Sequence, residues 1–209
     1  VLCTGVCWDG GAGTTIWSDA ANWSGDVLPG INDVAYLNLV DGVTVNHDAS
    51  GPSSGIDSIK GLNSTANNHL NISGGTLTLN DPATTSTLAG NLTINGGTLN
   101  ANANLTATTL NLSAGTLTGT GNLKVTTDFN QTGGSFAPTG NIDLTRSLGN
   151  FNFGAFTTGG TIALTTVGAL DITITGALQS SASGLTATQP AISLASGRDI
   201  ILNAVNLGA

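Results

Sequence analysis

Apolar and polar residues alternate in short runs along most of the chain. Clear examples are Leu70-x-Ile72, Leu92-x-Ile94, Leu110-x-Leu112, Ile142-x-Leu144 and Ile162-x-Leu164. Successive side chains of a strand point to opposite faces, so a period of two predicts strands with one buried face. Each run is short, which predicts strands of about five residues at most.

A longer pattern returns about every 20 residues from residue 70 onward. An Asn-apolar-polar run is followed by Gly-Gly-Thr-Leu or a close variant, and the Asn residues that mark the repeat are Asn71, Asn91, Asn111, Asn130 and Asn150. One such unit cannot bury its apolar face alone, so successive copies must stack. The sequence therefore predicts an all-β parallel β-helix with coils of about 20 residues. A β-sandwich fits the local alternation equally well, but the fixed period favours the solenoid.

Equivalent positions of adjacent coils lie above one another in such a stack. Inward Leu, Ile, Val and Phe then form apolar columns, and outward Asn side chains can hydrogen-bond along the axis. We expect Asn71, Asn91, Asn111, Asn130 and Asn150 to form one axial row.

Residues 1–60 have a different composition from the rest. They hold all three tryptophans, the one tyrosine and seven of the 12 acidic residues, and the aromatic positions are Trp8, Trp17, Trp23 and Tyr36. An open end of a β-helix exposes backbone and apolar side chains, so terminal units must cover it. We predict an N-terminal cap over 1–60 and coils over 61–209 that continue beyond the chain. A sugar-stacking platform is the alternative for these aromatic residues.

Composition and charge limit the chemistry. The net charge is −8 with four basic residues, which disfavours nucleic acid and anionic membrane surfaces as partners. No apolar run approaches the roughly 18–20 residues of a transmembrane helix, so no transmembrane segment is expected. Cys3 and Cys7 are predicted to form a disulfide, because Gly5 permits the turn that it requires and an exported chain meets an oxidising exterior.

Candidate catalytic and metal-binding residues are few. His47 and His69 are remote from the cysteines, and His47-Asp48 is no dyad within a strand because neighbours there point to opposite faces. Asp128 and Asp143 could meet on adjacent coils, but turn roles explain them better. We expect no catalytic residue, metal or cofactor, with calcium in the Asp-rich cap as the weaker alternative.

Two groups of residues resemble a known class of protein. Trp8-Asp9-Gly10-Gly11, Trp17-Ser18, Asn22-Trp23, Pro29-Gly30 and Asp33-Val34-Ala35-Tyr36 resemble the opening module of large bacterial surface proteins of the autotransporter-passenger and filamentous-haemagglutinin-like kind. The segment 192–203 is similar to the haemagglutinin-type repeat. The resemblance implies secretion, a right-handed parallel β-helix and a role in attachment or surface structure. It assigns no functional residue, because these families share no single site.

These observations lead us to expect a non-enzymatic, secreted bacterial surface protein. It would form a rigid stalk or adhesin whose receptor is a host or surface glycan or protein. One alternative is a filament or surface-layer subunit that associates end to end. The others are a carbohydrate-active β-helix and an ice-binding protein that uses outward Thr76-x-Thr78 and Thr116-x-Thr118.

Overall fold

The protein is an all-β solenoid with parallel coils of about 20 residues, as predicted from the repeat. The structure is a computed structural model that describes residues 3–51, 54–185, 190–203 and 207–208. Its only helix within those ranges is a 3-10 turn, η1 (Ala20–Asn22). In the same ranges, no helix has the length and apolar character needed to cross a membrane.

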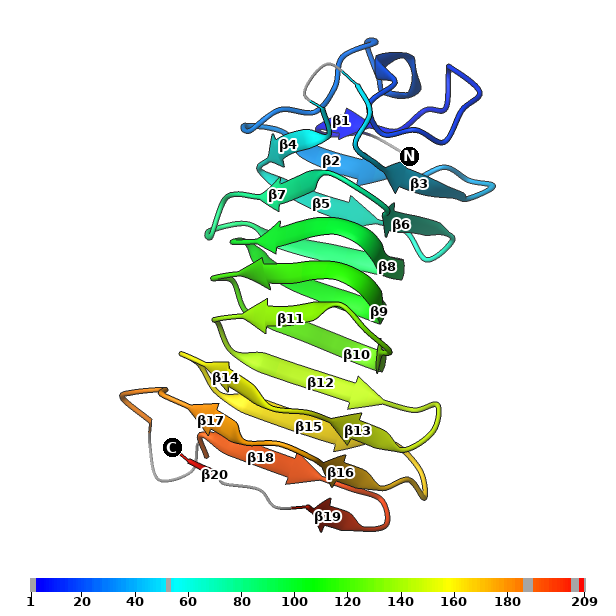
Figure 1. The fold of residues 1–209 in the computed structure, drawn as a ribbon. Coiled ribbons are helices and arrows are strands. Elements are labelled where there is room, and N and C mark those ends of the chain that lie inside the picture. Colours follow the sequence, from blue (N-terminus) through cyan, green and yellow to red (C-terminus); the bar gives the residue numbers. More distant parts are fainter. Residues whose placement is uncertain (1–2, 52–53, 186–189, 204–206, 209) are drawn as a thin grey trace.

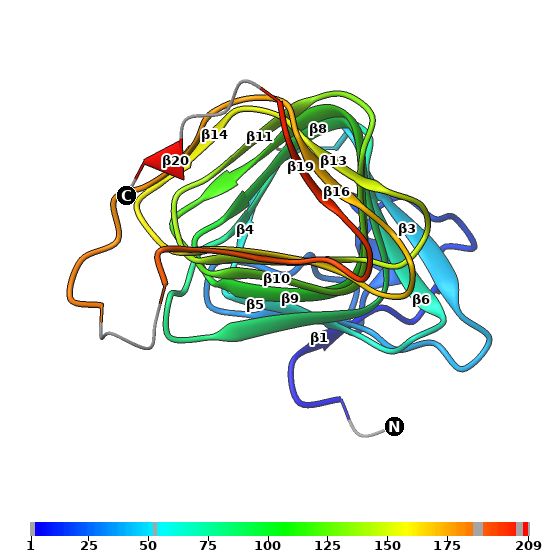
Figure 2. The same ribbon diagram turned by 90° about the horizontal axis from the view of Figure 1, so that it is seen from below.

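Each coil passes through three faces, which give the solenoid a triangular outline in end view (Figure 2). The first face is one continuous ladder of parallel strands. In stacking order its members are β1 (Val6–Cys7), β2 (Val34–Leu37), β5 (Gly61–Ser64), the start of β8 (Thr85–Ala101), the start of β9 (Asn104–Gly119), the start of β10 (Leu123–Gln131), β12 (Ile142–Arg146), β15 (Ile162–Thr166) and β18 (Ile192–Ala195).

The second and third faces are each divided into two blocks. On the second face, one block holds β3 (Val43–His47), β6 (Asn68–Ile72) and the later parts of β8, β9 and β10, and the other holds β13 (Phe151–Phe153), β16 (Ile172–Ile174) and β19 (Ile200–Leu202). On the third face, one block holds β4 (Ile56–Ile59), β7 (Thr76–Leu79), the ends of β8 and β9 and β11 (Ser135–Pro138), and the other holds β14 (Phe156–Thr158), β17 (Leu178–Ser180) and β20 (Leu207–Gly208). The chain winds in the right-handed sense from the N-terminal to the C-terminal end (Figures 1 and 2).

β8 and β9 are much longer than the predicted strands of about five residues. They span 17 and 16 residues, because their ladder pairing continues around two corners of the triangle. Register shifts mark the corners, for example between Leu88 and Asn91. In these two strands, the short alternating runs are the straight sides of one longer strand.

Among the described residues, one apolar core runs from Trp8 to Leu178, and Ile192 and Leu194 pack against it. Leu and Ile at alternate positions of the strands point inward, as Leu92, Leu110 and Leu144 show with 0% exposure. Tryptophans occupy the core at the N-terminal end, and phenylalanines occupy it between residues 129 and 156.

Coil length is less regular than the repeat in the sequence. Leu92 pairs with Leu110, 18 residues later, whereas Ile162 pairs with Ile192, 30 residues later. The stack also begins before the predicted boundary at residue 60, because β2, β3 and β4 already form a coil that pairs with β5, β6 and β7.

Candidate functional site

The N-terminal aromatic residues close the end of the core. Trp8, Trp17 and Trp23 are 2%, 1% and 0% exposed. Their rings meet edge to face at 4.7–5.0 Å between centroids. Tyr36 differs: it is half-buried on the outer side of β2, where its hydroxyl oxygen accepts a hydrogen bond from Thr4. The three tryptophans thus have no open ring face for a sugar.

Cys3 and Cys7 are joined by a disulfide at the start of the chain, with their Cα atoms 6.1 Å apart. Cys7 lies in β1, the first strand of the continuous ladder. The disulfide therefore ties the preceding residues to the N-terminal end of the stack.

The predicted axial row of Asn71, Asn91, Asn111, Asn130 and Asn150 is wrong at Asn91 and Asn150. Asn71 pairs with Thr93, which pairs with Asn111, and Asn111 pairs with Asn130. The coil that contains Gly90 is longer than the next, so Asn91 lies opposite Thr109 instead. Asn150 lies in the turn before β13, where its side chain bonds to Asp171. The observed column on the second face is Asn46, Asn71, Thr93, Asn111 and Asn130, and Asn71 donates to Asn46 Oδ1 at 2.8 Å.

The two aspartates that could have met on adjacent coils lie on different faces. Asp143 forms an ion pair with Lys124 on the first face. Asp128 is on the second face, where its Oδ1 accepts the backbone N–H groups of Ser147 and Leu148 at 3.1 and 3.2 Å. They therefore do not form the carboxylate pair that glycoside hydrolysis uses.

His47 has a structural position. Its Nδ1 donates to the carbonyl oxygen of Gly74 at 3.1 Å, and its Nε2 lies 3.0 Å from Asp57 Oδ2. The ring is fully buried against Trp17, so it joins coils and does not face solvent. In the described ranges, no cluster of three or more His, Cys, Asp or Glu residues could hold a metal ion.

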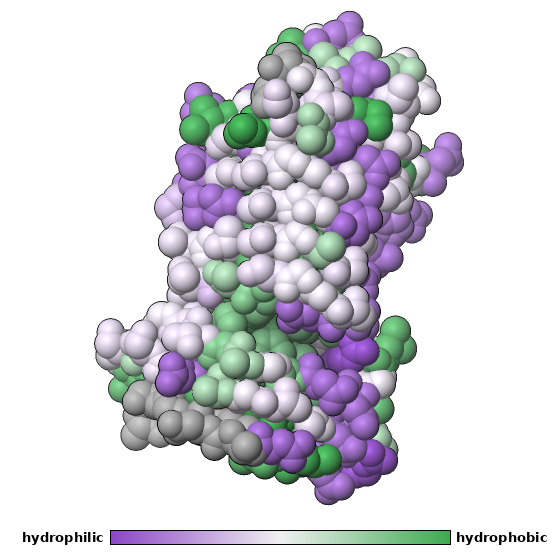
Figure 3. Space-filling model, viewed as in Figure 1, coloured by the Kyte–Doolittle hydropathy of each residue, from purple (hydrophilic) through white to green (hydrophobic). Residues whose placement is uncertain are grey.

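The second and third faces are interrupted between β10 and β11 on one side and β13 and β14 on the other (Figure 1), and a cleft lies at this interruption. β10 continues to β12 on the first face, but the later part of β10 does not pair with β13, and β11 does not pair with β14. The surface is hollowed there, and green apolar residues surround the hollow in Figure 3. The larger part of the cleft has a volume of about 500 Å³ and is lined by Phe136, Phe153 and Phe156 among others.

All five phenylalanines of the sequence gather at this interruption, namely Phe129, Phe136, Phe151, Phe153 and Phe156. Rings on opposite sides of the cleft lie 5.0 to 6.2 Å apart between centroids. Strands in a sheet are only about 4.8 Å apart, and aromatic pairs favour tilted or edge-to-face contact over close stacking. The bulk of the rings therefore explains why the coils separate here, whereas the aliphatic columns above and below stay paired.

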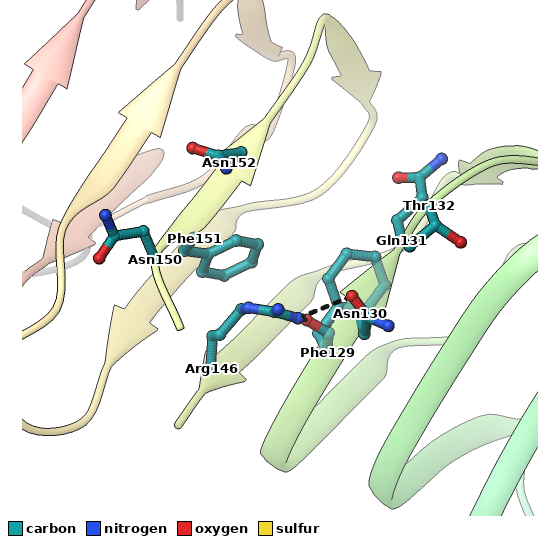
Figure 4. A pocket seen from close by; sticks show the side chains of 8 residues that line it. All are labelled: Phe129, Asn130, Gln131, Thr132, Arg146, Asn150, Phe151 and Asn152. Atoms are coloured by element: carbon teal, nitrogen blue, oxygen red, sulfur yellow. Dashed lines mark hydrogen bonds between the residues drawn. The ribbon is translucent and has the colours of Figure 1, made fainter. Parts of the chain in front are cut away.

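The smaller part of the cleft has a volume of about 210 Å³ and a polar rim (Figure 4). Asn130, Gln131, Asn150 and Asn152 supply amide groups, and Arg146 extends from the end of β12 toward β10. Arg146 Nη1 donates to the carbonyl oxygen of Phe129 at 2.7 Å and to Asn130 Oδ1 at 3.0 Å. The guanidinium thus lies at the end of the column of Asn side chains, at the point where the second face is interrupted.

Among the described residues that line the cleft, Arg146 is the one cation. The nearest carboxylate is Asp128, whose Oδ2 lies 3.9 Å from Arg146 Nη1. The Nε–H of Arg146 is buried and has no hydrogen-bond partner among the described residues. Arg146 and Asp128 thus form an ion pair at the cleft rim, and the charges of the two side chains offset each other.

A chain of polar contacts holds the C-terminal wall of the cleft. Asn150 donates to Asp171 Oδ2 at 3.2 Å, and Asp171 in turn receives a two-pronged contact from Arg198 on the following coil. The hydrogen bonds from Arg198 hold the pKa of the Asp171 carboxyl below its usual value, and those from the Asp199 N–H and Asn150 act in the same direction.

This lowered pKa makes the C-terminal coils sensitive to acid. A lowered carboxyl pKa stabilises the folded state at neutral pH, and the stabilisation is lost as the pH falls through the folded-state pKa. We expect the thermal unfolding midpoint to decrease once the pH drops below about 4. Asp171→Asn should lower the thermal unfolding midpoint at pH 7 and reduce its further decrease at acidic pH. Asp143→Asn removes a more exposed ion pair and should leave the decrease at acidic pH unchanged. Parallel pH curves for the wild type and Asp171→Asn would contradict this assignment.

The alternation and the repeat did not predict the cleft. One signal in the sequence points to it: the inward positions change from Leu and Ile to Phe only between residues 129 and 156.

The outward Thr residues of the third face form a column of Thr76, Thr98 and Thr116, while the neighbouring column is interrupted by Asn100 and Ala137.

Comparison with known proteins found no matching family, no matching curated protein and no matching solved structure.

Proposed function

We propose that the chain is a non-enzymatic rod of a secreted bacterial surface protein, which serves as a stalk or adhesin. The observation that carries the proposal is the first face, where one ladder runs without a break from β1 to β18. Each coil of such a solenoid contacts only its neighbours, and the ladder and core hold the coils in line. A stiff rod of this kind suits a protein that holds a binding surface away from a cell.

Three further features support the proposal. The disulfide between Cys3 and Cys7 suits the oxidising conditions outside the cytosol. The net charge of −8 favours a soluble, non-aggregating surface. The cleft between the coil blocks gives the rod a place where a glycan or protein receptor can bind.

Antibody labelling of intact cells of the source organism tests the location. We expect an antibody raised against this chain to label cells without permeabilisation, and external protease to remove the signal. A cytoplasmic protein serves as the control and should be labelled only after permeabilisation. Labelling of this chain only after permeabilisation would overturn the proposal. Sedimentation of the purified chain separately tests whether it associates end to end into a filament. A chain that sediments as a monomer at all concentrations would contradict this alternative.

A further inference from the structure

The cleft leaves two sheet edges without a partner. On its N-terminal side, β11 and residues 128–131 of β10 pair only with β9. On its C-terminal side, β13 pairs only with β16, and β14 only with β17. None of the described strands pairs with either edge from within the cleft. An exposed edge of this kind is a template for another strand.

Hydrogen bonds to the next coil show which groups of the C-terminal edge face the cleft. Phe151 N–H donates to the carbonyl oxygen of Asp171, and the carbonyl oxygen of Phe153 accepts from Thr175, both away from the cleft. In a parallel ladder, successive residues direct their N–H and C=O groups to opposite sides. The backbone groups of Asn152 therefore face the cleft. The same reasoning applies to Thr157, because Phe156 N–H donates to Ala177 on the far side.

The N-terminal edge has the complementary arrangement. Thr132 N–H donates to the carbonyl oxygen of Leu112 in β9, so the backbone groups of Gln131 face the cleft. The carbonyl oxygen of Phe129 accepts from Arg146 on the cleft side, which agrees with this alternation. In β11, the Thr139 N–H donates to the carbonyl oxygen of Gly119. The backbone groups of Phe136 and Pro138 therefore face the cleft. Pro138 has no N–H, which suits an edge strand.

We propose that the cleft binds an extended segment of a partner polypeptide, which adds as a strand to these edges. Gln131 and Phe136 on one side, and Asn152 and Thr157 on the other, would supply the backbone hydrogen bonds. The phenylalanine rings would receive apolar side chains from alternate positions of the segment. The inference rests on the proposed attachment role, because it names the kind of partner that the rod would hold.

Charge complementarity narrows the chemistry of the segment. Arg146 at the cleft rim is already paired with Asp128, whose Oδ2 lies 3.9 Å from Arg146 Nη1, while Asp128 Oδ1 accepts two backbone N–H groups. The charges at the rim are thus already paired, so the best segment is uncharged and alternates apolar with small polar residues.

The cleft must widen to admit the segment, and the phenylalanine rings that meet across it at 5.0 to 6.2 Å must separate. Cα atoms of β11 and β14 come within 8 Å of each other. A strand that pairs with both edges needs two strand spacings, about 9.6 Å. The unbroken pairing of β10 with β12 on the first face provides the hinge for this movement.

A fluorescent peptide that copies residues 109–118 is a direct probe. In the native stack this part of β9 pairs with strands on both of its sides across the same two faces. We expect saturable binding, measured by fluorescence anisotropy. The Gln131→Pro variant removes a cleft-facing N–H and should weaken binding about 3-fold to 10-fold, whereas Gln131→Ala keeps the N–H and should bind as the wild type does.

Amide hydrogen exchange of the unaltered chain gives a second readout that needs no variant. Without peptide, the amides of Gln131, Phe136, Asn152 and Thr157 should exchange faster than those of Thr132 and Phe151, and the peptide should protect them. No saturable binding, equal affinities of the Gln131→Pro and wild-type chains, or protection elsewhere only would overturn the inference. Surface labelling of intact cells would be unaffected by any of these results, so the two proposals fail separately.

Discussion

Replacing Trp23 by alanine is expected to lower the free energy of unfolding by about 3–5 kcal/mol. The side chain is 0% exposed, so its removal leaves a cavity at the N-terminal end of the core. The contacts of its ring with Trp8 and Trp17 are lost as well, and each aromatic pair contributes about 0.5–1.5 kcal/mol beyond burial. Its Nε1–H also donates to the carbonyl oxygen of Trp17 at 2.8 Å, and that oxygen would become unpaired.

Urea unfolding followed by circular dichroism measures this loss. Coils of a solenoid interact mainly with their neighbours, so the damage should begin at the N-terminal end. Amide hydrogen exchange should therefore show lost protection in β1, β2 and β3 before β15. Val40→Ala is the control, because Val40 is 84% exposed and its truncation should change stability by less than about 0.5 kcal/mol. A loss below about 1 kcal/mol in Trp23→Ala would show that the three tryptophans do not close the core.

Local patterns in the sequence predict the architecture because they are repeated physical constraints. The alternation at Leu70-x-Ile72 and Leu92-x-Ile94 sets one buried face, and the period of about 20 residues requires stacking. Neither constraint depends on where a coil begins or ends. The parallel solenoid therefore follows without knowledge of the register.

The register does depend on coil length, and the sequence repeat does not report it. Asn71 and Asn91 occupy equivalent places in the repeat, yet Asn71 pairs with Thr93, because the turn at 80–84 and the corner near Gly90 both hold more residues than their counterparts in the next coil. Residues in corners do not alternate, so an insertion there leaves the strand pattern unchanged. The cleft was not predicted for a related reason. Phe and Leu are both apolar, so a pattern of apolar and polar positions does not distinguish them, and only the size of the phenyl rings separates the coils.

Gly115→Ala is expected to lower the free energy of unfolding by about 2–5 kcal/mol. Gly115 lies at the corner between the second and third faces with φ of +71°, and a Cβ atom there would be 2.2 Å from the carbonyl oxygen of Gly97. A left-handed backbone conformation costs an alanine about 1–2 kcal/mol. The overlap with the backbone of the neighbouring coil adds about 1–3 kcal/mol, because the coils must move apart to relieve it.

Gly13→Ala separates these two contributions. Gly13 has nearly the same φ of +70°, but a Cβ atom there would have no neighbour within 4 Å. Gly13→Ala should therefore lower the free energy of unfolding only by the cost of the left-handed conformation, about 1–2 kcal/mol. The stability difference between the two variants, measured by urea unfolding, reports how closely adjacent coils approach at this corner. Equal losses in both would mean that adjacent coils have room for a side chain there, contrary to the close approach that the pairing of β8 with β9 on all three faces implies.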